Sequence, residues 1–151
     1  YGNYYTWGGT HAQSKRKYKD DHWDGDKTLP SSRDIATISW GKEWRIPTEE
    51  EFETLLEECG EGEWVEDYMG SGINGRLFRG DGMFAEQELF FPASGYCDHS
   101  SFYNLGSDGY YWSSVPYEDN VAWYLSFYND DVDIYNDKRL SGLSVRAVLN
   151  E

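Results

Sequence analysis

Three histidines and two cysteines are the side chains of this 151-residue chain with the greatest capacity for catalysis. His11, His22 and His99 lie in polar stretches, without the companion spacing of a metal site or a catalytic motif. Cys59 and Cys97 lack the spacing of a metal-binding pair, and they could form a disulfide or stay reduced. No nucleophile elbow, zinc-protease motif or phosphate-binding glycine loop occurs. We therefore expect no catalytic site.

The stretch DDHWDGD could offer several oxygen atoms to a calcium ion, from Asp20, Asp21, Asp24 and Asp26. It lacks the twelve-residue calcium-loop pattern and its distal glutamate, and solvated carboxylates are the common outcome in a chain this acidic. We expect no cofactor, and calcium is the only metal for which the sequence offers a candidate loop.

Residues 117–137 combine a strand-like apolar pattern with a narrow set of polar side chains. Val121, Trp123, Leu125 and Phe127 alternate as the buried side of a strand would. Thirteen of these 21 residues are Tyr, Asn, Asp or Ser, the types that dominate adaptable binding surfaces. The candidate binding residues are Tyr117, Asp119, Asn120, Tyr124, Ser126, Tyr128, Asn129, Asp130, Asp131, Asp133, Tyr135, Asn136 and Asp137, with Ser141 as a further candidate.

The composition is that of one acidic, aromatic-rich domain. A chain of this length buries about two-thirds of its unfolded surface, and seven Trp, 13 Tyr and seven Phe are too many aromatics for a disordered chain. The net charge of −15 makes nucleic acid and anionic membranes poor partners. No apolar run is long enough to insert in a membrane. No signal peptide opens the sequence, so we expect a mature chain or a piece of a longer one.

The clearest predicted helix covers residues 46–60. Thr48 and Glu51 have the spacing of a capping box, and Gly60 supplies an end signal. Apolar residues at helical spacing, beginning with Phe52, predict one buried face.

A second helix is predicted over residues 31–41. Ser32 is its expected cap, and Ile35, Ile38 and Trp40 are expected to face inward.

After residue 60 the sequence alternates between turn-forming residues and short strands. A short strand is also expected at the start of the chain, and Leu77 and Phe78 are assigned to a loop. The predicted strands are 1–9, 89–91, 109–114, 121–128, 131–135 and 144–149. Helices in the first half and antiparallel strands in the second predict an α+β fold, with residues 1–151 as a single domain.

Six stretches occur in order along nearly the whole chain: YGNYYTWGG, DIATISWGKEWRIPTEEEFETLL, LFFPASGY, GYYWSSVP, AWYLSF and GLSVRAV. Together they resemble a family of bacterial surface and phage-borne domains with the C-type-lectin fold, related to the formylglycine-generating enzymes. The resemblance implies two helices packed on short antiparallel sheets with long irregular loops. Trp44, Arg45, Pro47, Trp112 and Trp123 would belong to the scaffold. We expect the Trp123→Ala substitution to cost about 3–5 kcal/mol, as the truncation of a buried aromatic side chain.

Residues 117–137 further resemble the variable region of proteins diversified by diversity-generating retroelements. In those systems an error-prone reverse transcriptase substitutes bases at adenines, so that Asn codons of the AAY type become codons for Tyr, Asp, Ser, His and others. The narrow polar set matches that outcome, whereas Glu118 and Lys138 are not expected products and would be fixed. The variable region would cover roughly 98–146, with 98–104 at the edge of its surface.

These resemblances imply a ligand-binding or adhesion protein rather than an enzyme. Its partner would be a protein or other macromolecule on a target surface, and the acidic side chains predict a preference for basic patches. The protein would act at a cell surface, on a virion or outside the cell.

Two alternatives stay open. An undiversified bacterial surface adhesin or lectin-like domain could carry the same acidic, tyrosine-rich hairpin. A formylglycine-generating-type oxidase would need a close pair of cysteines near the C-terminal signature, and no cysteine follows Cys97. The tripeptides of calcium-dependent sugar binding in this fold, E-P-N, Q-P-D and W-N-D, are absent.

Overall fold

Helix α2 (Glu49–Cys59) begins and ends at its predicted signals in the computed structural model, which describes residues 1–151. The hydroxyl of Thr48 accepts a hydrogen bond from the Glu51 amide at 3.2 Å, and the Glu51 carboxylate accepts one from the Thr48 amide at 2.8 Å. Gly60 ends the helix at a φ of 67°, in the left-handed region that glycine favours. Phe52 is buried against the sheet. The prediction of this helix is confirmed.

Helix α1 (Ile35–Trp40) is shorter than predicted, and its cap is Asp34 rather than Ser32. The buried Asp34 carboxylate accepts hydrogen bonds from two amides of α1 and from an amide just before α2. Ile38 and Trp40 are 49% and 59% exposed, so the prediction that they face inward is wrong. Six residues make fewer than two helical turns, so only the first turn reaches the core.

Ten strands form four small antiparallel sheets. One sheet pairs β1 (Trp44–Arg45) with β10 (Val148–Leu149), and another joins β2 (Glu63–Val65), β3 (Gly75–Arg79) and β4 (Glu88–Pro92). The hairpin of β5 (Tyr96–Asp98) and β6 (Ser101–Tyr103) is the third, and the largest joins β7 (Gly109–Glu118), β8 (Val121–Phe127) and β9 (Val132–Lys138). Short 3₁₀ turns lie at Tyr68–Gly70 and Gly82–Phe84. The α+β class is therefore as predicted.

The strand β3 corrects the assignment of Leu77 and Phe78 to a loop. Both side chains are buried, and the strand pairs with β2 on one side and with β4 on the other. The glycine at position 75 made the sequence of this strand resemble a turn. A Cβ at Gly75 would lie 2.2 Å from the carbonyl oxygen of Phe91, so the strand requires glycine there. Here glycine marks a close approach between two strands rather than a turn.

The ends of the chain contain less regular structure than predicted. Residues 1–9 form only isolated bridges, at Tyr4 and Tyr5, and of residues 144–149 only the last two form a strand. Tyr5 nevertheless bonds Leu143 through both main-chain groups, at 2.9 and 3.0 Å. The segments around Tyr5 and Leu143 therefore lie side by side.

The sheet β7–β8–β9 separates two hydrophobic clusters. Leu125 and Phe127 pack on one side with Phe52 of α2 and with residues of β3 and β4. Trp112 and Ala122 pack on the other side with residues of the N-terminal segment and α1. The sheet thus has a core on each face.

The predicted buried face of β8 is only half confirmed. Leu125 and Phe127 are buried, but Val121 and Trp123 are partly exposed and belong to neither cluster. The Trp123 ring instead contacts exposed Tyr117, with 4.6 Å between ring centroids.

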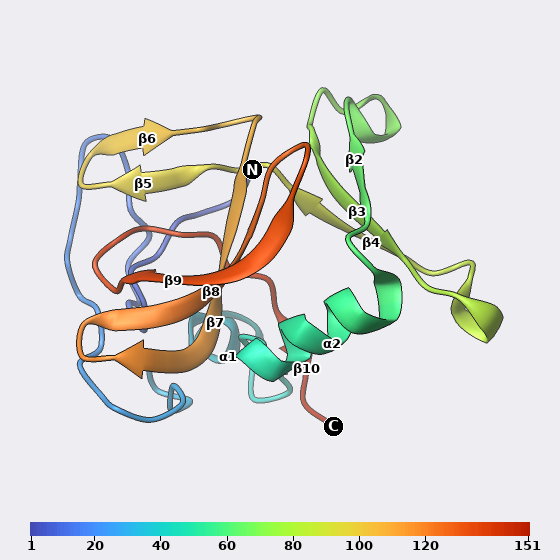
Figure 1. The fold of residues 1–151 in the computed structure, drawn as a ribbon. Helices are drawn as coiled ribbons and strands as arrows, with labels where there is room; N and C mark the ends of the chain where they lie inside the picture. The colour runs from blue at the N-terminus through green and yellow to red at the C-terminus, as the bar shows by residue number, and fades with distance from the viewer.

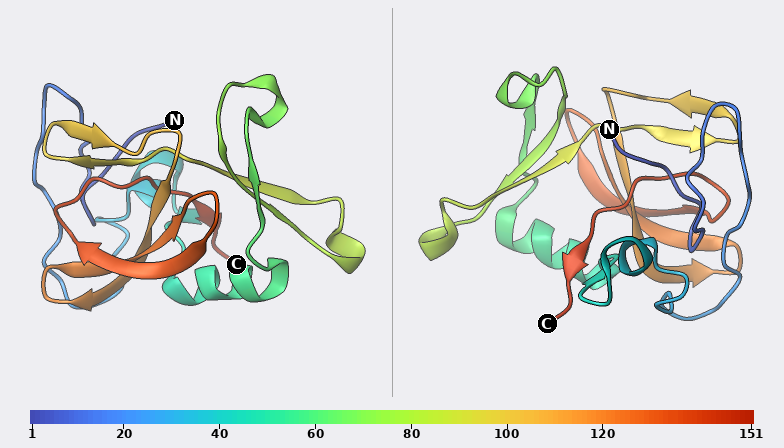
Figure 2. Two further views of the ribbon diagram at one scale, coloured as in Figure 1. Left: turned by 45° about the horizontal axis from the view of Figure 1, so that its top comes forward. Right: turned by 180° about the vertical axis from the view of Figure 1, so that it is seen from behind.

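The hairpin β3–β4 extends away from the rest of the molecule (Figure 1), whereas the β5–β6 hairpin lies against β7 through the Tyr96 and Tyr110 rings. Seen from behind, α1 lies near β10 and the C-terminus (Figure 2). None of the helices combines the length and the apolar character that a membrane crossing requires.

Candidate functional site

The pairing of β8 with β9 places five of the predicted binding residues on one face of the sheet. Tyr124 lies opposite Tyr135, and Ser126 lies opposite Asp133, while Asp137 is paired with Ala122. Because alternate residues of a strand share a face, these side chains lie on the side away from α2.

Three further tyrosines extend this face into the neighbouring hairpin. Ring centroids are 6.4 Å apart for Tyr135 and Tyr124, 5.9 Å for Tyr124 and Tyr110, and 5.3 Å for Tyr110 and Tyr96. Tyr103 of β6 continues the row at 5.1 Å from Tyr96. We call these five residues the tyrosine face.

The middle of the tyrosine face is held in place, whereas its two ends are open. The Tyr110 hydroxyl donates a hydrogen bond to Asp108 at 2.8 Å and accepts one from the Asn104 amide group at 3.1 Å. Tyr103 and Tyr135 are 44% and 47% exposed. A ligand would therefore meet two accessible rings that rest on a row of packed ones.

Burial and neighbouring carboxylates raise the pKa of several tyrosines in the tyrosine face. Burial, followed by the charge of Asp137, raises the pKa of Tyr124 to about 12. The charge of Asp133 is the main cause that raises the pKa of Tyr135. Burial raises the pKa of Tyr96 as well. Near neutral pH the surface therefore offers neutral phenol groups beside negative charges, an arrangement that suits cationic groups.

Most of the other candidates lie in the two turns at the ends of β8. The first turn, residues 118–121, holds Asp119 and Asn120, both exposed, and Tyr117 precedes it. The second turn, residues 128–131, holds Tyr128, Asn129, Asp130 and Asp131. Because a seven-residue strand separates the turns by about 20 Å or more, they do not form one contiguous patch with each other.

Two candidates lie apart from the tyrosine face. Asn136 is paired with Trp123 and is exposed on the side of the sheet that faces α2. Ser141 is only 8% exposed, and its hydroxyl lies 3.5 Å from an Asp137 carboxylate oxygen. Ser141 is thus beneath the surface rather than on it.

The histidines and the DDHWDGD stretch form local contacts. His22 lies between Asp20 and Asp24, at 2.5 and 2.9 Å, and Asp21 accepts a hydrogen bond from His11 at 2.6 Å. No three His, Cys, Asp or Glu side chains converge in the arrangement of a metal site. Both cysteines are free, with Cys97 buried.

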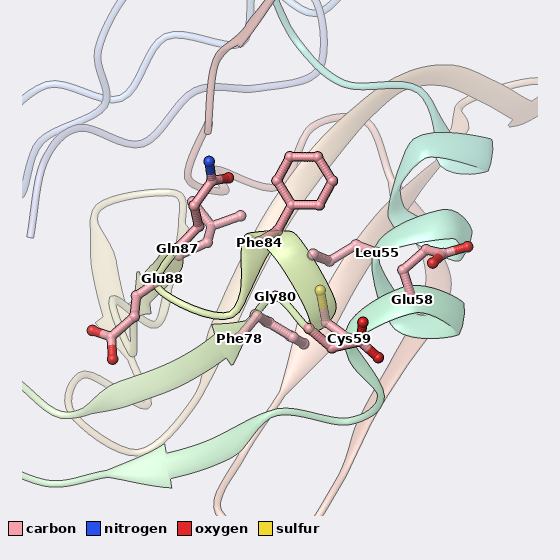
Figure 3. Close-up of a pocket in the computed structure, with 10 residues that line it drawn as sticks. Leu55, Glu58, Cys59, Phe78, Gly80, Phe84, Gln87 and Glu88 are labelled. Carbon is pink, nitrogen blue, oxygen red and sulfur yellow. The ribbon is translucent and has the colours of Figure 1, made fainter.

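A cavity of about 530 Å³ lies between α2 and the β3–β4 hairpin. Leu55, Cys59 and Phe84 line it, and Figure 3 shows these side chains between the helix and the hairpin. The cavity is on the opposite side of the sheet from the tyrosine face. Its lining combines apolar side chains with Glu58, Asp81, Gln87 and Glu88.

Sequence reasoning missed Tyr96, Tyr110 and Asp108. The stretch GYYWSS did predict a strand, and its alternation would place Tyr110 with Trp112. Which side of that strand stays open depends on the β5–β6 hairpin, which contacts β7 through the Tyr96 ring, and the residue before the hairpin bridges to β7 between Gly95 and Gly109.

The comparisons with known proteins concern the second half of the chain. Residues 79–148 are similar to a family described as a domain of unknown function (DUF8237). The matched region includes the tyrosine face and both turns. No curated protein and no solved structure matched the chain.

Proposed function

We propose that this chain is a ligand-binding domain with the C-type-lectin fold, which displays a surface diversified by a retroelement reverse transcriptase. The observation behind the proposal is the tyrosine face with its adjoining turns. Exposed Tyr103 and Tyr135 flank a row of half-buried tyrosines, and exposed Asp and Asn side chains occupy the two turns beside them. Two helices, small antiparallel sheets and the main-chain pairing of Tyr5 with Leu143 are compatible with the lectin-like fold.

The ligand that suits this surface is a protein with exposed arginine or lysine side chains. Aromatic rings bind such cations through their faces, and the carboxylates of Asp133, Asp137 and Asp108 add charge complementarity. The binding step involves no chemical change. It would occur at a cell surface, on a virion or outside the cell, without nucleic acid as partner.

The alternative is an undiversified adhesin, which could bind its ligand through the same surface. It differs from the main proposal in its genetics rather than in its chemistry. The decisive observation is the DNA around the gene: we expect a reverse transcriptase gene and a near-copy of the segment that encodes residues 98–146, differing at adenines. Without both, the domain is an ordinary adhesin.

The tolerance of the surface is tested by a joint substitution of Tyr103, Asn129, Asp130, Asp133 and Tyr135 by Ala. These side chains are exposed, so we expect the melting temperature to change by less than about 5 °C. A library with Tyr, Asn, Asp or Ser at these positions, displayed on yeast, should yield binders to lysozyme, a basic protein used as the probe.

Unfolding of the joint variant would show that these residues are structural and would refute the proposal. A library that folds but yields no binder to the probe would refute the recognition role. Turnover of a thiol peptide substrate with copper or calcium present would favour the oxidase instead.

A further inference from the structure

Two arginines are buried in this protein without a carboxylate partner. Arg76 and Arg139 are 4% and 2% exposed, and neither forms a salt bridge. A buried charge is costly unless hydrogen bonds compensate it. All of the hydrogen bonds donated by these two side chains go to main-chain carbonyl oxygens.

Arg76, in β3, binds the second turn. One terminal nitrogen lies 2.7 Å from the carbonyl oxygen of Tyr128 and 3.4 Å from those of Asn129 and Asp131. Its Nε donates to the carbonyl oxygen of Glu61 at 2.6 Å. The turn is closed by a main-chain bond of 3.0 Å from Tyr128 to Asp131, and its side chains form no hydrogen bonds within the protein.

Arg139, just after β9, binds the first turn in the same way. Its side chain donates to the carbonyl oxygens of Glu118 and Val121, at 2.9 and 3.2 Å, and its amide donates to that of Asn120 at 2.8 Å. The guanidinium lies over the Trp7 ring at 4.4 Å and also binds carbonyl groups of residues 23 and 25.

We infer that Arg76 and Arg139 are positioning residues that fix the main-chain path of the two turns independently of the turn side chains. Every peptide unit has the same carbonyl group, so in the second turn the anchor stays when Tyr, Asp, Asn or Ser replace one another. A guanidinium suits this role because its five donors reach several oxygens at once, whereas a lysine offers one compact ammonium. The use of this anchor for a variable surface rests on the proposed function, but the anchor itself does not.

The test is amide hydrogen exchange measured by NMR, without any ligand. We compare the Tyr128 amide, which closes the second turn, with the Leu125 amide in the central strand. We expect Arg76→Lys to accelerate exchange at Tyr128 about tenfold or more relative to Leu125, since hydrogen bonds to a charged donor are lost locally. Arg79→Lys is the matched control, because Arg79 lies in the same strand but is exposed and bonded to surface glutamates.

The second arm replaces the turn side chains, with Asn129→Tyr and Asp130→Ser together. With Arg76 in place, we expect the Tyr128 exchange rate to stay within about threefold. In the Arg76→Lys protein the same pair should change it about tenfold or more. If Arg76→Lys fails to fold, the pair in the unaltered protein still decides the question.

Equal acceleration at Tyr128 and Leu125 in Arg76→Lys would mean general destabilisation and would refute the inference. A large effect of the turn substitutions with Arg76 intact would refute it as well. Failure of the display library with intact anchoring would refute only the proposed function, so the two outcomes are distinguishable.

Discussion

Trp112 and Trp123 are both tryptophans of the central sheet, but only Trp112 is fully packed. It is 1% exposed, and its ring nitrogen donates a hydrogen bond to the Tyr5 carbonyl oxygen at 2.8 Å. Trp123, in the central strand β8, is only partly buried and contacts exposed Tyr117 near the first turn. We therefore expect truncation to destabilise the protein more at Trp112 than at Trp123.

We expect Trp112→Ala to lower the free energy of unfolding by about 3–5 kcal/mol, the usual cost of truncating a buried aromatic side chain. Trp123→Ala should cost less than half as much, because its ring keeps part of its contact with water. Urea unfolding followed by far-UV circular dichroism measures both without relying on tryptophan fluorescence. Equal losses would contradict the assignment of Trp123 to the surface.

Tyr124 predicts a dependence of stability on alkaline pH. Tyrosines of the unfolded chain ionise near a pKa of about 10, whereas the folded protein holds the pKa of Tyr124 at about 12. Between these values the unfolded state has lost the proton that the folded state still binds, so the free energy of unfolding falls as pH rises from about 10 to about 12.

Tyr124→Phe should reduce that fall, while Tyr117→Phe, at an exposed position, serves as the control. Urea unfolding at several pH values across the interval gives the comparison, and absorbance at 295 nm follows phenol ionisation. An unchanged pH dependence in Tyr124→Phe would show that another group causes the fall.

At the scale of elements, local sequence signals were enough to predict α2. The start of α1 and the exposure of residues in β8 depend on contacts with residues distant in the sequence. The capping box of α2 lies within four residues, so the sequence displays it directly. The cap of α1 depends on the contact of Asp34 with the Ile46 amide, twelve residues away. The exposure of Trp123 likewise depends on what covers it, which alternation along β8 does not reveal.

The candidate site was likewise predictable where it depends on local alternation, and not where it depends on long-range contacts. Alternation along β8 and β9 correctly places Tyr124 and Tyr135 on strand faces that can share one surface. Tyr96 could not be added from sequence, because its place beside Tyr110 depends on how the β5–β6 hairpin folds onto the sheet, which alternation along β5 does not reveal.

The capping box of α2 is expected to stabilise the helix. Thr48→Ala should lower the free energy of unfolding by about 1 kcal/mol, because the Glu51 amide loses its acceptor. Thr54→Ala, on the exposed side of the same helix, should change stability by less than about 0.5 kcal/mol. The midpoints of urea unfolding for the two variants measure this difference in stability. Similar midpoints would argue against a structural role of the cap.

At the scale of the whole molecule, the main feature is that the buried residues of the core are separate from the exposed residues of the candidate site. Each face of the central sheet has its own hydrophobic cluster, and we therefore expect the fold to tolerate substitution at the exposed ends of the tyrosine face. The net charge of −15 would speed the approach of a basic partner, and salt would weaken that attraction.

The outer strand of the central sheet has one more consequence. β9 pairs with β8 and with no other strand, so one edge of its main chain is free. Free edges invite a second copy to add its own strand, the first step toward fibrils. Asp133 and Asp137 lie along β9, and two such edges brought together would repel each other. We therefore expect the charges suited to a basic ligand also to oppose edge-to-edge association of two copies of the domain.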